Sequence, residues 1–326
     1  MNHEKYDLVI IGAGICGLTI GKLLTNSSVN FKIFEKSRAF GGRASTRRVN
    51  GQPIDHGAQY FTVTDLSFRE FINEYIELGI VKLWSNKLNI WDGKSLMYES
   101  QTNPRYICPD GFTALSKEIA KVIPVSREVR ITKANFNNKK WELLTDQNLE
   151  IEAEKVISTA PINQSLEIFS NYLREEELMQ LQSVNFDPCI SVILVYELAN
   201  YIPWKGVFWN SGDTLSWVAN DSSKRTNPTQ TVIVAQCKPD FSRLNFKSED
   251  EHVTNLVINE LKQILPTWVQ SPQETQVKRW KYSKANSTLD KPFFESENKK
   301  LIFTGDWCLE SKIESAFLCA EILYPN

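Results

Sequence analysis

The sequence has few of the side chains that build metal centres and few signals of a secreted or membrane protein. Its histidines, His3, His56 and His252, are dispersed along 326 residues, so we expect no metal site. The 6 cysteines form no C-x-x-C pair and no obvious disulfide framework, which favours a reducing, cytoplasmic compartment. No apolar run approaches the length of a membrane span, and the N-terminus lacks a signal-peptide pattern, so we expect no membrane partner.

The sequence also lacks a large net charge and familiar hydrolase motifs. The formal net charge is −2, and 23% of the residues are charged, which gives no reason to expect binding to nucleic acid. No G-x-S-x-G elbow and no H-E-x-x-H motif occurs, so hydrolases and metalloenzymes are disfavoured. With 326 residues, 42% of them hydrophobic, the chain is long enough for two domains or one large composite.

The most informative stretch is residues 6–36. Residues 8–11 are all apolar, as in a strand buried on both faces, and Gly12, Gly14 and Gly17 follow at G-x-G-x-x-G spacing. In this pattern the first glycine permits a tight turn, the second lets backbone approach a pyrophosphate, and the third lets helix and strand pack closely. The spacing therefore predicts a dinucleotide-binding loop.

The segments after the glycines support this prediction. They predict a helix over residues 16–24, whose amino end favours an anion, and a strand over residues 31–34. Glu35 then ends that strand, where an acid binds the ribose of a dinucleotide. Gly21 lies one turn beyond Gly17 and, having no side chain, is expected to let the same helix face pack closely. The alternative is a glycine-rich turn without a ligand, which explains the ordered set less well.

Residues 40–46, FGGRAST, follow the ribose acid closely. Gly42 permits close backbone approach, and Arg43 supplies a fixed cation for a phosphate. The alternative is an ordinary turn with a solvated arginine.

Residues 55–62, DHGAQYFT, combine small, amide and aromatic side chains. Gln59 is placed to hydrogen-bond the edge of a flat ligand, and Tyr60 to line its pocket. The alternative is the start of a strand with a capping Asp55 and a buried tyrosine. His56 alone is more often structural than catalytic.

The middle of the chain reads mainly as β-structure. Residues 128–133, 140–144 and 150–152 are predicted as strands of a small antiparallel sheet, and residues 155–161 as a separate buried strand. Residues 162–275 then predict a second, aromatic-rich lobe, whose tryptophans at positions 204, 209 and 217 we interpret as packing residues.

The C-terminal segment, like residues 6–36, combines a buried strand, an acid and a helix. Residues 301–306, LIFTGD, predict a buried strand that ends in Asp306, and residues 313–323 predict an apolar helix. An acid at the tip of a buried strand, beside a helix amino end, is placed to bind a hydroxylated chain. We therefore expect both ends of the chain to meet on one cofactor.

Taken in order, GAGICG, Glu35, GGRAST, DHGAQYFT, KVISTAP, RWKYS and TGDWCL resemble the flavin-dependent amine oxidase superfamily. The D-x-G-A-Q-Y-F-T pattern is similar to its bacterial renalase-like branch. This resemblance implies an α/β fold in which a Rossmann-type FAD-binding domain is joined to a discontinuous second α+β substrate lobe. The FAD-binding domain would comprise residues 1–62, 100–161 and 276–326, and the lobe residues 63–99 and 162–275.

The resemblance also implies which residues contact FAD. They are Gly12, Gly14, Cys16, Gly17, Glu35, Gly42, Arg43, Gln59, Tyr60, Val129, Asp306 and Ile313. Among them, Glu35 would bind the adenosine ribose, Val129 the adenine through its backbone, and Ile313 the pyrimidine edge of the flavin through its backbone. One departure concerns this last contact, since residues 311–316 read SKIESA where relatives usually carry GRVEGA.

For the substrate, the resemblance implies a pocket with Tyr60, Trp280 and Tyr282 as aromatic walls. Trp280 lies in the segment that returns from the lobe to the cofactor domain, where the flavin ring is expected. The alternative for Trp280 is an indole that only packs between the two domains.

The implied reaction is oxidation of the 2- and 6-dihydro isomers of NAD(P) to NAD(P)⁺, with oxygen as acceptor and hydrogen peroxide as product. No convincing catalytic base is present, which is consistent with direct hydride transfer to a flavin. Two alternatives remain: oxidation of an amine or another small apolar reductant, and a flavin-binding redox module without turnover.

Overall fold

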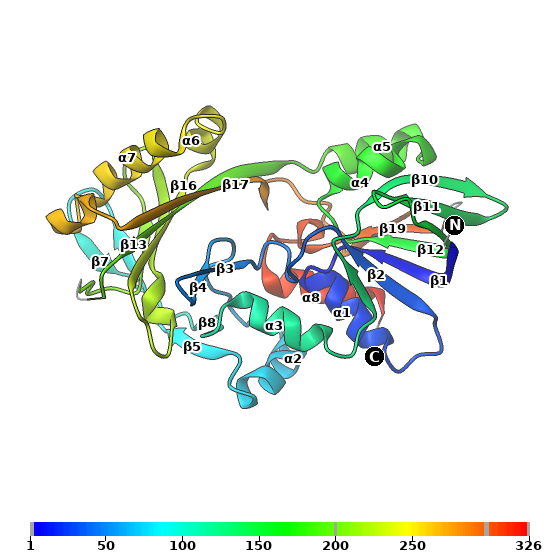
Figure 1. The fold of residues 1–326 in the computed structure, drawn as a ribbon, viewed down its shortest axis with the longest axis horizontal. Coiled ribbons are helices and arrows are strands. Elements are labelled where there is room, and N and C mark those ends of the chain that lie inside the picture. Colours follow the sequence, from blue (N-terminus) through cyan, green and yellow to red (C-terminus); the bar gives the residue numbers. More distant parts are fainter. Residues whose placement is uncertain (1–2, 199–200, 297–299, 325–326) are drawn as a thin grey trace. The chain divides into compact units, whose positions relative to one another are not determined.

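The structure confirms the α/β class that the sequence predicts. A computed structural model describes residues 3–198, 201–296 and 300–324. In this part of the chain, parallel strands from distant segments form one sheet, and a largely antiparallel set of strands forms another (Figure 1).

The chain divides into two compact units. Unit 1 comprises Met1–Ala44, Thr113–Phe186 and Ala285–Asn326, and unit 2 comprises Ser45–Phe112 and Asp187–Lys284. Residues 45–62, 100–112 and 276–284 therefore belong to unit 2, although they were assigned to the FAD-binding domain from the sequence, and residues 162–186, assigned to the substrate lobe, belong to unit 1. That assignment remains a prediction about cofactor contacts.

Parallel strands form the centre of the unit 1 sheet. These strands are β1 (His3–Ile11), β2 (Phe31–Glu35), β9 (Val125–Arg127), β12 (Glu150–Ser158) and β19 (Leu301–Thr304). On one side of β1 lie β2 and then β9, and on the other lie β12 and then β19. The strand order thus reverses at β1, and in such sheets a ligand binds beyond the carboxyl ends of the strands at the reversal.

Strand β12 corrects the prediction of two short strands at residues 150–152 and 155–161. It is one strand with two neighbours on its outer edge: β11 (Lys140–Thr145) pairs with its first half and β19 with its second. The predicted strand over residues 128–133 starts too early, because Glu128, with a left-handed φ of 59°, follows the end of β9, and only residues 131–133 lie in a strand. Strand β10 (Ile131–Asn137) then begins and pairs with β11, while β18 (Phe293–Ser296) pairs with β19.

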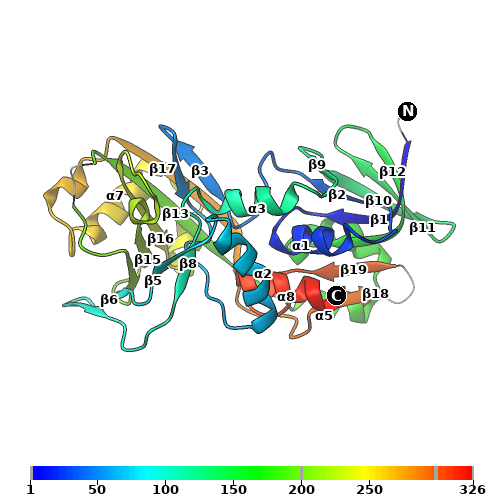
Figure 2. The same cartoon turned by 90° about the horizontal axis from the view of Figure 1, so that it is seen from below.

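Helices cover both faces of this sheet. They are α1 (Ile15–Leu24), α3 (Phe112–Ala120), α4 (Ile162–Phe169), α5 (Glu175–Gln182) and α8 (Ile313–Leu323), with short 3-10 helices η1 (Ser170–Tyr172) and η4 (Asp306–Cys308). Helices α1 and α8 pack together on one face, and α4 and α5 lie on the other (Figures 1 and 2). Phe169 of α4 anchors the second layer against Trp141 and Phe303, with ring centroids 5.4 and 6.1 Å away.

The unit 2 sheet has the order β17-β13-β16-β15-β14-β6-β7. Its strands are β6 (Asn89–Trp91), β7 (Leu96–Tyr98), β13 (Phe186–Tyr196), β14 (Gly206–Trp209), β15 (Leu215–Asn220), β16 (Thr231–Cys237) and β17 (Glu274–Ala285). From β13 to β7 the pairing is antiparallel except between β14 and β6, which are parallel.

Alternating side chains of β13 serve two different cores. Val192 and Leu194 pack under α6 (Pro239–Leu244) and α7 (Asp250–Leu261), together with Trp204 and Trp209. The residues between them, Ile193 and Val195, instead pack against the hairpin of β3 (Thr46–Val49) and β4 (Gln52–Asp55). Because successive side chains point to opposite faces of a strand, burial on both faces requires the apolar run SVILVY.

The remaining elements of unit 2 connect these layers. They are α2 (Leu66–Glu77), β5 (Lys82–Ser85), β8 (Arg105–Ile107), and the 3-10 helices η2 (Asp221–Lys224) and η3 (Thr267–Gln270). The carboxylate of Asp65 caps α2 by accepting bonds from the amides of Ser67 and Phe68, as N-cap aspartates do.

Candidate functional site

The glycine-rich loop follows β1 at the carboxyl edge of the unit 1 sheet. Gly12 has a φ of +104°, and a Cβ on Gly17 would lie 2.0 Å from the carbonyl oxygen of Gly12. Both positions therefore require glycine, as the spacing predicts. A Cβ on Gly14 would meet nothing within 4 Å, so backbone there borders open space. Cys16, in the first turn of α1, is buried, and burial raises the pKa of its thiol well above its ordinary value.

The carboxylate of Glu35 lies at the end of β2, beside this loop. One oxygen accepts from the amide of Ala13 at 2.8 Å and the other from the amide of Ser37 at 2.7 Å. The side chain is thus fixed beside the glycine-rich turn rather than solvated, with only 7% of its surface exposed.

The second glycine motif lies directly against the first. The amide of Gly41 donates to the carbonyl of Ala13 at 2.9 Å, and Gly14 and Gly41 form an isolated parallel bridge. A Cβ on Gly42 would lie 3.5 Å from the Cα of Gly14. The two motifs, read separately from the sequence, therefore form one backbone cradle.

Arg43 extends this cradle to the other end of the chain. Its guanidinium forms an ion pair with Asp306, which follows β19, and lies 5.7 Å from the ring centroid of Phe186. Burial raises the pKa of the Asp306 carboxyl, and Arg43 opposes that shift. The structure thus brings together two predicted cofactor residues that are 263 positions apart.

Thr159 directly follows β12 and connects the end of this strand to the glycine-rich loop. Its hydroxyl donates to the carbonyls of Ile11 and Gly12 at 3.0 and 3.2 Å. The indole of Trp307 donates to the carbonyl of Ala160 at 3.1 Å. Sequence reasoning singled out neither Thr159 nor Trp307 as a site residue, although both lie in motifs that it used.

Ile313 is the first residue of α8, so its amide lies at the positive end of that helix. The unusual Ser311 has a structural use, since its hydroxyl oxygen accepts from the amide of Ala285 at 2.7 Å. Lys312 is exposed and pairs with Glu310, so its charge serves an ion pair on the surface.

Val129 lies just beyond Glu35 in space. Its amide donates to the carbonyl of Glu35 at 3.0 Å. A backbone contact with adenine would therefore have to use the carbonyl of Val129.

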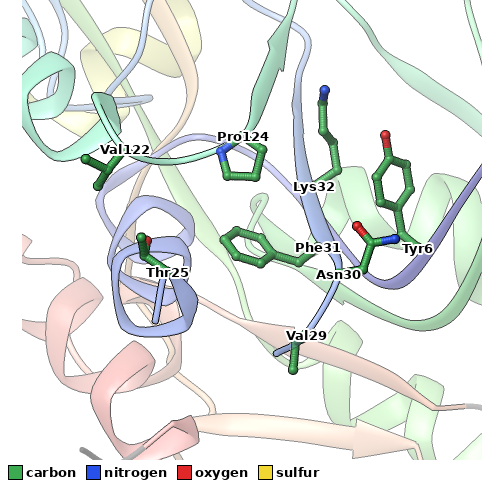
Figure 3. A pocket seen from close by; sticks show the side chains of 8 residues that line it. All are labelled: Tyr6, Thr25, Val29, Asn30, Phe31, Lys32, Val122 and Pro124. Atoms are coloured by element: carbon green, nitrogen blue, oxygen red, sulfur yellow. The ribbon is translucent and has the colours of Figure 1, made fainter. Parts of the chain in front are cut away.

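A surface pocket lies elsewhere in unit 1 (Figure 3). Its lining includes Tyr6, Asn30, Phe31 and Lys32. Phe31 begins β2, whereas Glu35 ends it, so this pocket is at the opposite end of the strand from the glycine cradle. The rule that ligands bind at carboxyl ends gives it no part in holding the dinucleotide.

In unit 2, the amide of Gln59 is held from three directions. Its Nε2 donates to the carbonyls of Asp55 and Gly57 at 2.6 and 3.1 Å, and its Oε1 accepts from Lys224 at 3.1 Å. These bonds orient the side chain. Its predicted contact with the flavin ring stays a prediction.

Tyr60 lies in an aromatic cluster with Trp84 and Trp217, whose ring centroids are 6.4 and 5.3 Å from its own. The guanidinium of Arg105 lies 5.6 Å from the centroid of the Tyr60 ring. Burial raises the pKa of Tyr60 while Arg105 opposes the shift, so the phenol stays protonated at neutral pH. Arg105 was not identified from the sequence.

Trp280 is fixed against His56. Its indole nitrogen donates to the carbonyl of His56 at 3.0 Å, and the two rings stack with centroids 5.4 Å apart. Burial lowers the pKa of His56 to about 4, so the imidazole is neutral at pH 7. Tyr282, two residues further along β17, lies beside the ammonium of Lys281, 5.1 Å from its ring centroid.

Comparison with known proteins now decides the family. The family model "Flavin containing amine oxidoreductase" matches residues 93–321, well over half of the chain. The chain belongs to this family. A second model, "NAD(P)-binding Rossmann-like domain", matches residues 10–75.

Among individual members, the chain is similar to renalase of Mus musculus, with 28% identity over 305 residues and 87% of each chain covered. Solved structures give the same fold at low identity. Putrescine oxidase matches with a TM-score of 0.76 at 13% identity, covering 99% of this chain and 98% of that one. Cyclohexylamine oxidase of Brevibacterium oxydans matches with a TM-score of 0.74 at 12% identity, covering 98% and 99%.

The chain is therefore an FAD-dependent oxidoreductase, and the residues of unit 1 fit that cofactor. Positive φ angles at Gly12 and Gly42 and open space at the Cα of Gly14 provide backbone that a pyrophosphate can approach. The Glu35 carboxylate and the Arg43–Asp306 pair lie on the same edge of the sheet. Which atoms of FAD each residue contacts remains a proposal.

Unit 2 contains a buried network of charged side chains that was not predicted from the sequence. Arg225 donates to Asp55 at 2.8 Å and to Asp221 at 2.7 Å, and Lys224 lies 3.1 Å from Asp221. The four side chains are almost fully buried. A possible signal was DSSKR at residues 221–225, which places an aspartate three and four residues before two cations, between two apolar strands.

This network positions the segment that contains Gln59 and Tyr60. Asp55 also accepts from Thr46 at 2.6 Å and from the amide of Phe112 at 3.1 Å, so it does more than cap a strand.

Across the described ranges 3–198, 201–296 and 300–324, no helix is long and apolar enough to cross a membrane.

Proposed function

We propose that this oxidoreductase oxidises the 2- and 6-dihydro isomers of NAD(P) to NAD(P)⁺, with oxygen as the electron acceptor. In balance, one dihydronicotinamide, one O₂ and one proton yield the nicotinamide cation and H₂O₂. FAD, when bound, supplies a two-electron acceptor for the hydride. Similarity to renalase over 87% of both chains supports this proposal.

The main structural support for the proposal is the fixed aromatic ring of Trp280 in unit 2. Trp280 presents a large flat ring that a hydrogen bond and a stacked imidazole hold in place. Planar nicotinamides stack favourably on such rings. His56 is neutral and no base is needed, because hydride loss from a dihydronicotinamide leaves an aromatic cation without proton removal.

In this proposal each predicted residue has a defined task. Tyr60, Trp280 and Tyr282 contact the substrate and exclude water from the reacting carbon. Gln59 and Tyr60 border the isoalloxazine, with Lys224 orienting Gln59. The unit 1 residues Glu35, Arg43, Asp306 and Ile313 bind FAD, together with the glycine loop.

Oxidation of an amine is the second candidate, since the family model describes amine oxidoreductases. The aromatic cluster disfavours it. A protonated amine would be bound by aromatic faces or a carboxylate, but Arg105 already lies over Tyr60 and Phe208, and Lys224 over Trp84. These aromatic faces are therefore already occupied by cations.

Anaerobic mixing of the FAD-loaded protein with single donors tests these functions. We expect 2- or 6-dihydro-NAD(P) to bleach the flavin band rapidly, and ordinary 4-dihydro-NADH, the matched control, to do so far more slowly. Admitting oxygen should restore the band and yield one peroxide per donor. Bleaching by amines alone would establish the second candidate, and no bleaching by any donor would indicate a flavin-binding module without turnover.

A further inference from the structure

One face of β17 carries a row of side chains that the protein core does not use. Val277 packs in the core beneath α7, and Arg279 bonds Asp250 of α7 at 2.5 Å. Because side chains alternate along a strand, Lys278 and Trp280 point to the opposite face. On the same side of the sheet, the β3–β4 hairpin packs on the neighbouring strand β13, where Ile54 contacts Ile193 and Val195.

The same hairpin directs a second cation to this face. Arg47 is paired with Ile54, so both side chains lie on the same side of the hairpin. His56 follows Ile54 by two residues, so its side chain lies on that side too. Its amide donates to the carbonyl of Ser45 at 3.2 Å, and its ring stacks on Trp280. Arg48 points away and donates to the carbonyl of Gly51.

Arg47 and Lys278 therefore bring two positive charges to one aromatic face. Burial and the charge of Arg47 both lower the pKa of Lys278, as expected for neighbouring cations. In the part of the chain that the structure describes, neither cation forms an ion pair within 4.0 Å, and the carboxylate of Asp250 is engaged by Arg279. Two adjacent like charges are unfavourable unless an anion joins them.

His56 adds a polar atom to this place. Its Nε2 lies 3.3 Å from the hydroxyl of Ser45, whereas its buried Nδ1 has no hydrogen-bond partner among the described residues. A buried polar atom without a partner costs free energy. A ligand beside the His56–Trp280 stack could supply one.

We propose that Arg47 and Lys278 bind a phosphate group of a dinucleotide substrate whose nicotinamide stacks on Trp280. The inference rests on the proposed function and adds to it the part of the substrate that confers selectivity. Lys278 and Trp280 are two residues apart on one strand face, about 7 Å along the strand. That spacing matches a base and a phosphate separated by one ribose.

Two measurements on FAD-loaded protein test the assignment. Calorimetric titration with NAD⁺ and with NADP⁺ measures binding without turnover. Anaerobic flavin reduction compares 6-dihydro-NAD with the corresponding dihydronicotinamide riboside, which lacks phosphate. The variants are Arg47→Gln and Lys278→Gln, with Arg48→Gln as the matched control because its side chain lies on the other side of the same strand.

We expect Arg47→Gln and Lys278→Gln each to weaken dinucleotide binding by roughly tenfold or more, as for hydrogen bonds to charged groups. The preference for dinucleotide over riboside should fall by a similar factor, while Arg48→Gln matches the wild type. Weakening with both dinucleotides places the pyrophosphate between the cations, and weakening with NADP⁺ alone places its 2′-phosphate there.

Unaltered binding and selectivity in both variants would overturn the proposal, as would a wild-type protein that binds neither dinucleotide. Failure of the proposed function has a different signature. In that case neither dihydronicotinamide bleaches the wild-type flavin, whereas calorimetry still reports whether Arg47 and Lys278 bind phosphate.

Discussion

The carboxylate of Glu35 accepts a hydrogen bond from the backbone amide of Ala13 at 2.8 Å. This bond ties the acid at the end of β2 to the centre of the glycine-rich turn after β1. Glu35 thus supports the loop that meets the pyrophosphate, in addition to its proposed contact with the ribose.

Glu35→Ala should therefore weaken FAD binding without unfolding the protein. A carboxylate hydrogen bond contributes about 1.5–3 kcal/mol, which corresponds to roughly a ten- to hundredfold increase in Kd. Titration of the apoprotein with FAD measures this change. Glu35→Gln keeps an acceptor for Ala13 and should lose less, and equal affinities in all three proteins would show that Glu35 does not contact FAD.

Trp280→Ala should slow flavin reduction by dihydronicotinamides about tenfold, the value of one lost stacking interaction. FAD content should remain near stoichiometric, because the predicted FAD contacts do not include Trp280. Trp280→Phe keeps a ring and should retain more of the rate. Stopped-flow absorbance of the flavin measures both variants; loss of FAD together with solubility would instead assign Trp280 to packing.

His56 should make folding stability depend on pH in a defined window. Burial lowers the pKa of His56 from 6.5 to about 4, so between these values the unfolded chain binds more protons than the native one. Its contribution to stability is complete above about pH 6.5 and is lost as the pH falls towards 4.

His56→Gln should remove this part of the acid sensitivity. Urea unfolding between pH 7.5 and pH 4.5 should show the wild type losing more free energy of unfolding than the variant. His252→Gln, at an exposed position in α7, serves as the control and should follow the wild type. Parallel curves for His56→Gln and the wild type would contradict the assignment.

Arg225→Met should be strongly destabilising. Arg225 bonds both Asp55 and Asp221 in the interior of unit 2, and removing one partner leaves buried carboxylates short of positive charge. The expected cost is about 3–5 kcal/mol in the free energy of unfolding, measured by urea denaturation.

Arg243→Met is the comparison for Arg225→Met. Arg243 pairs with Asp187 at 2.9 Å, and about half of its side chain is exposed, so its loss should cost about 0–1 kcal/mol. Similar costs for the two variants would mean that the buried network contributes little.

The sequence alone determined the features that depend on local spacing. The glycine triplet, the acid that ends β2 and helix α8 were all predictable, because a tight turn, a helix amino end and an apolar 3.6-residue period leave their mark within a few residues. The order of these motifs along the chain also identified the family and the cofactor.

Only the tertiary structure decided which distant groups meet. The ion pair of Arg43 with Asp306, the stack of His56 on Trp280 and the ion pair of Arg225 with Asp55 join segments far apart in sequence. The single strand β12 likewise exists because β11 and β19 both pair with it. Such contacts depend on how strands and hairpins pack, and local composition is the same whether a charged side chain is solvated or buried against a partner.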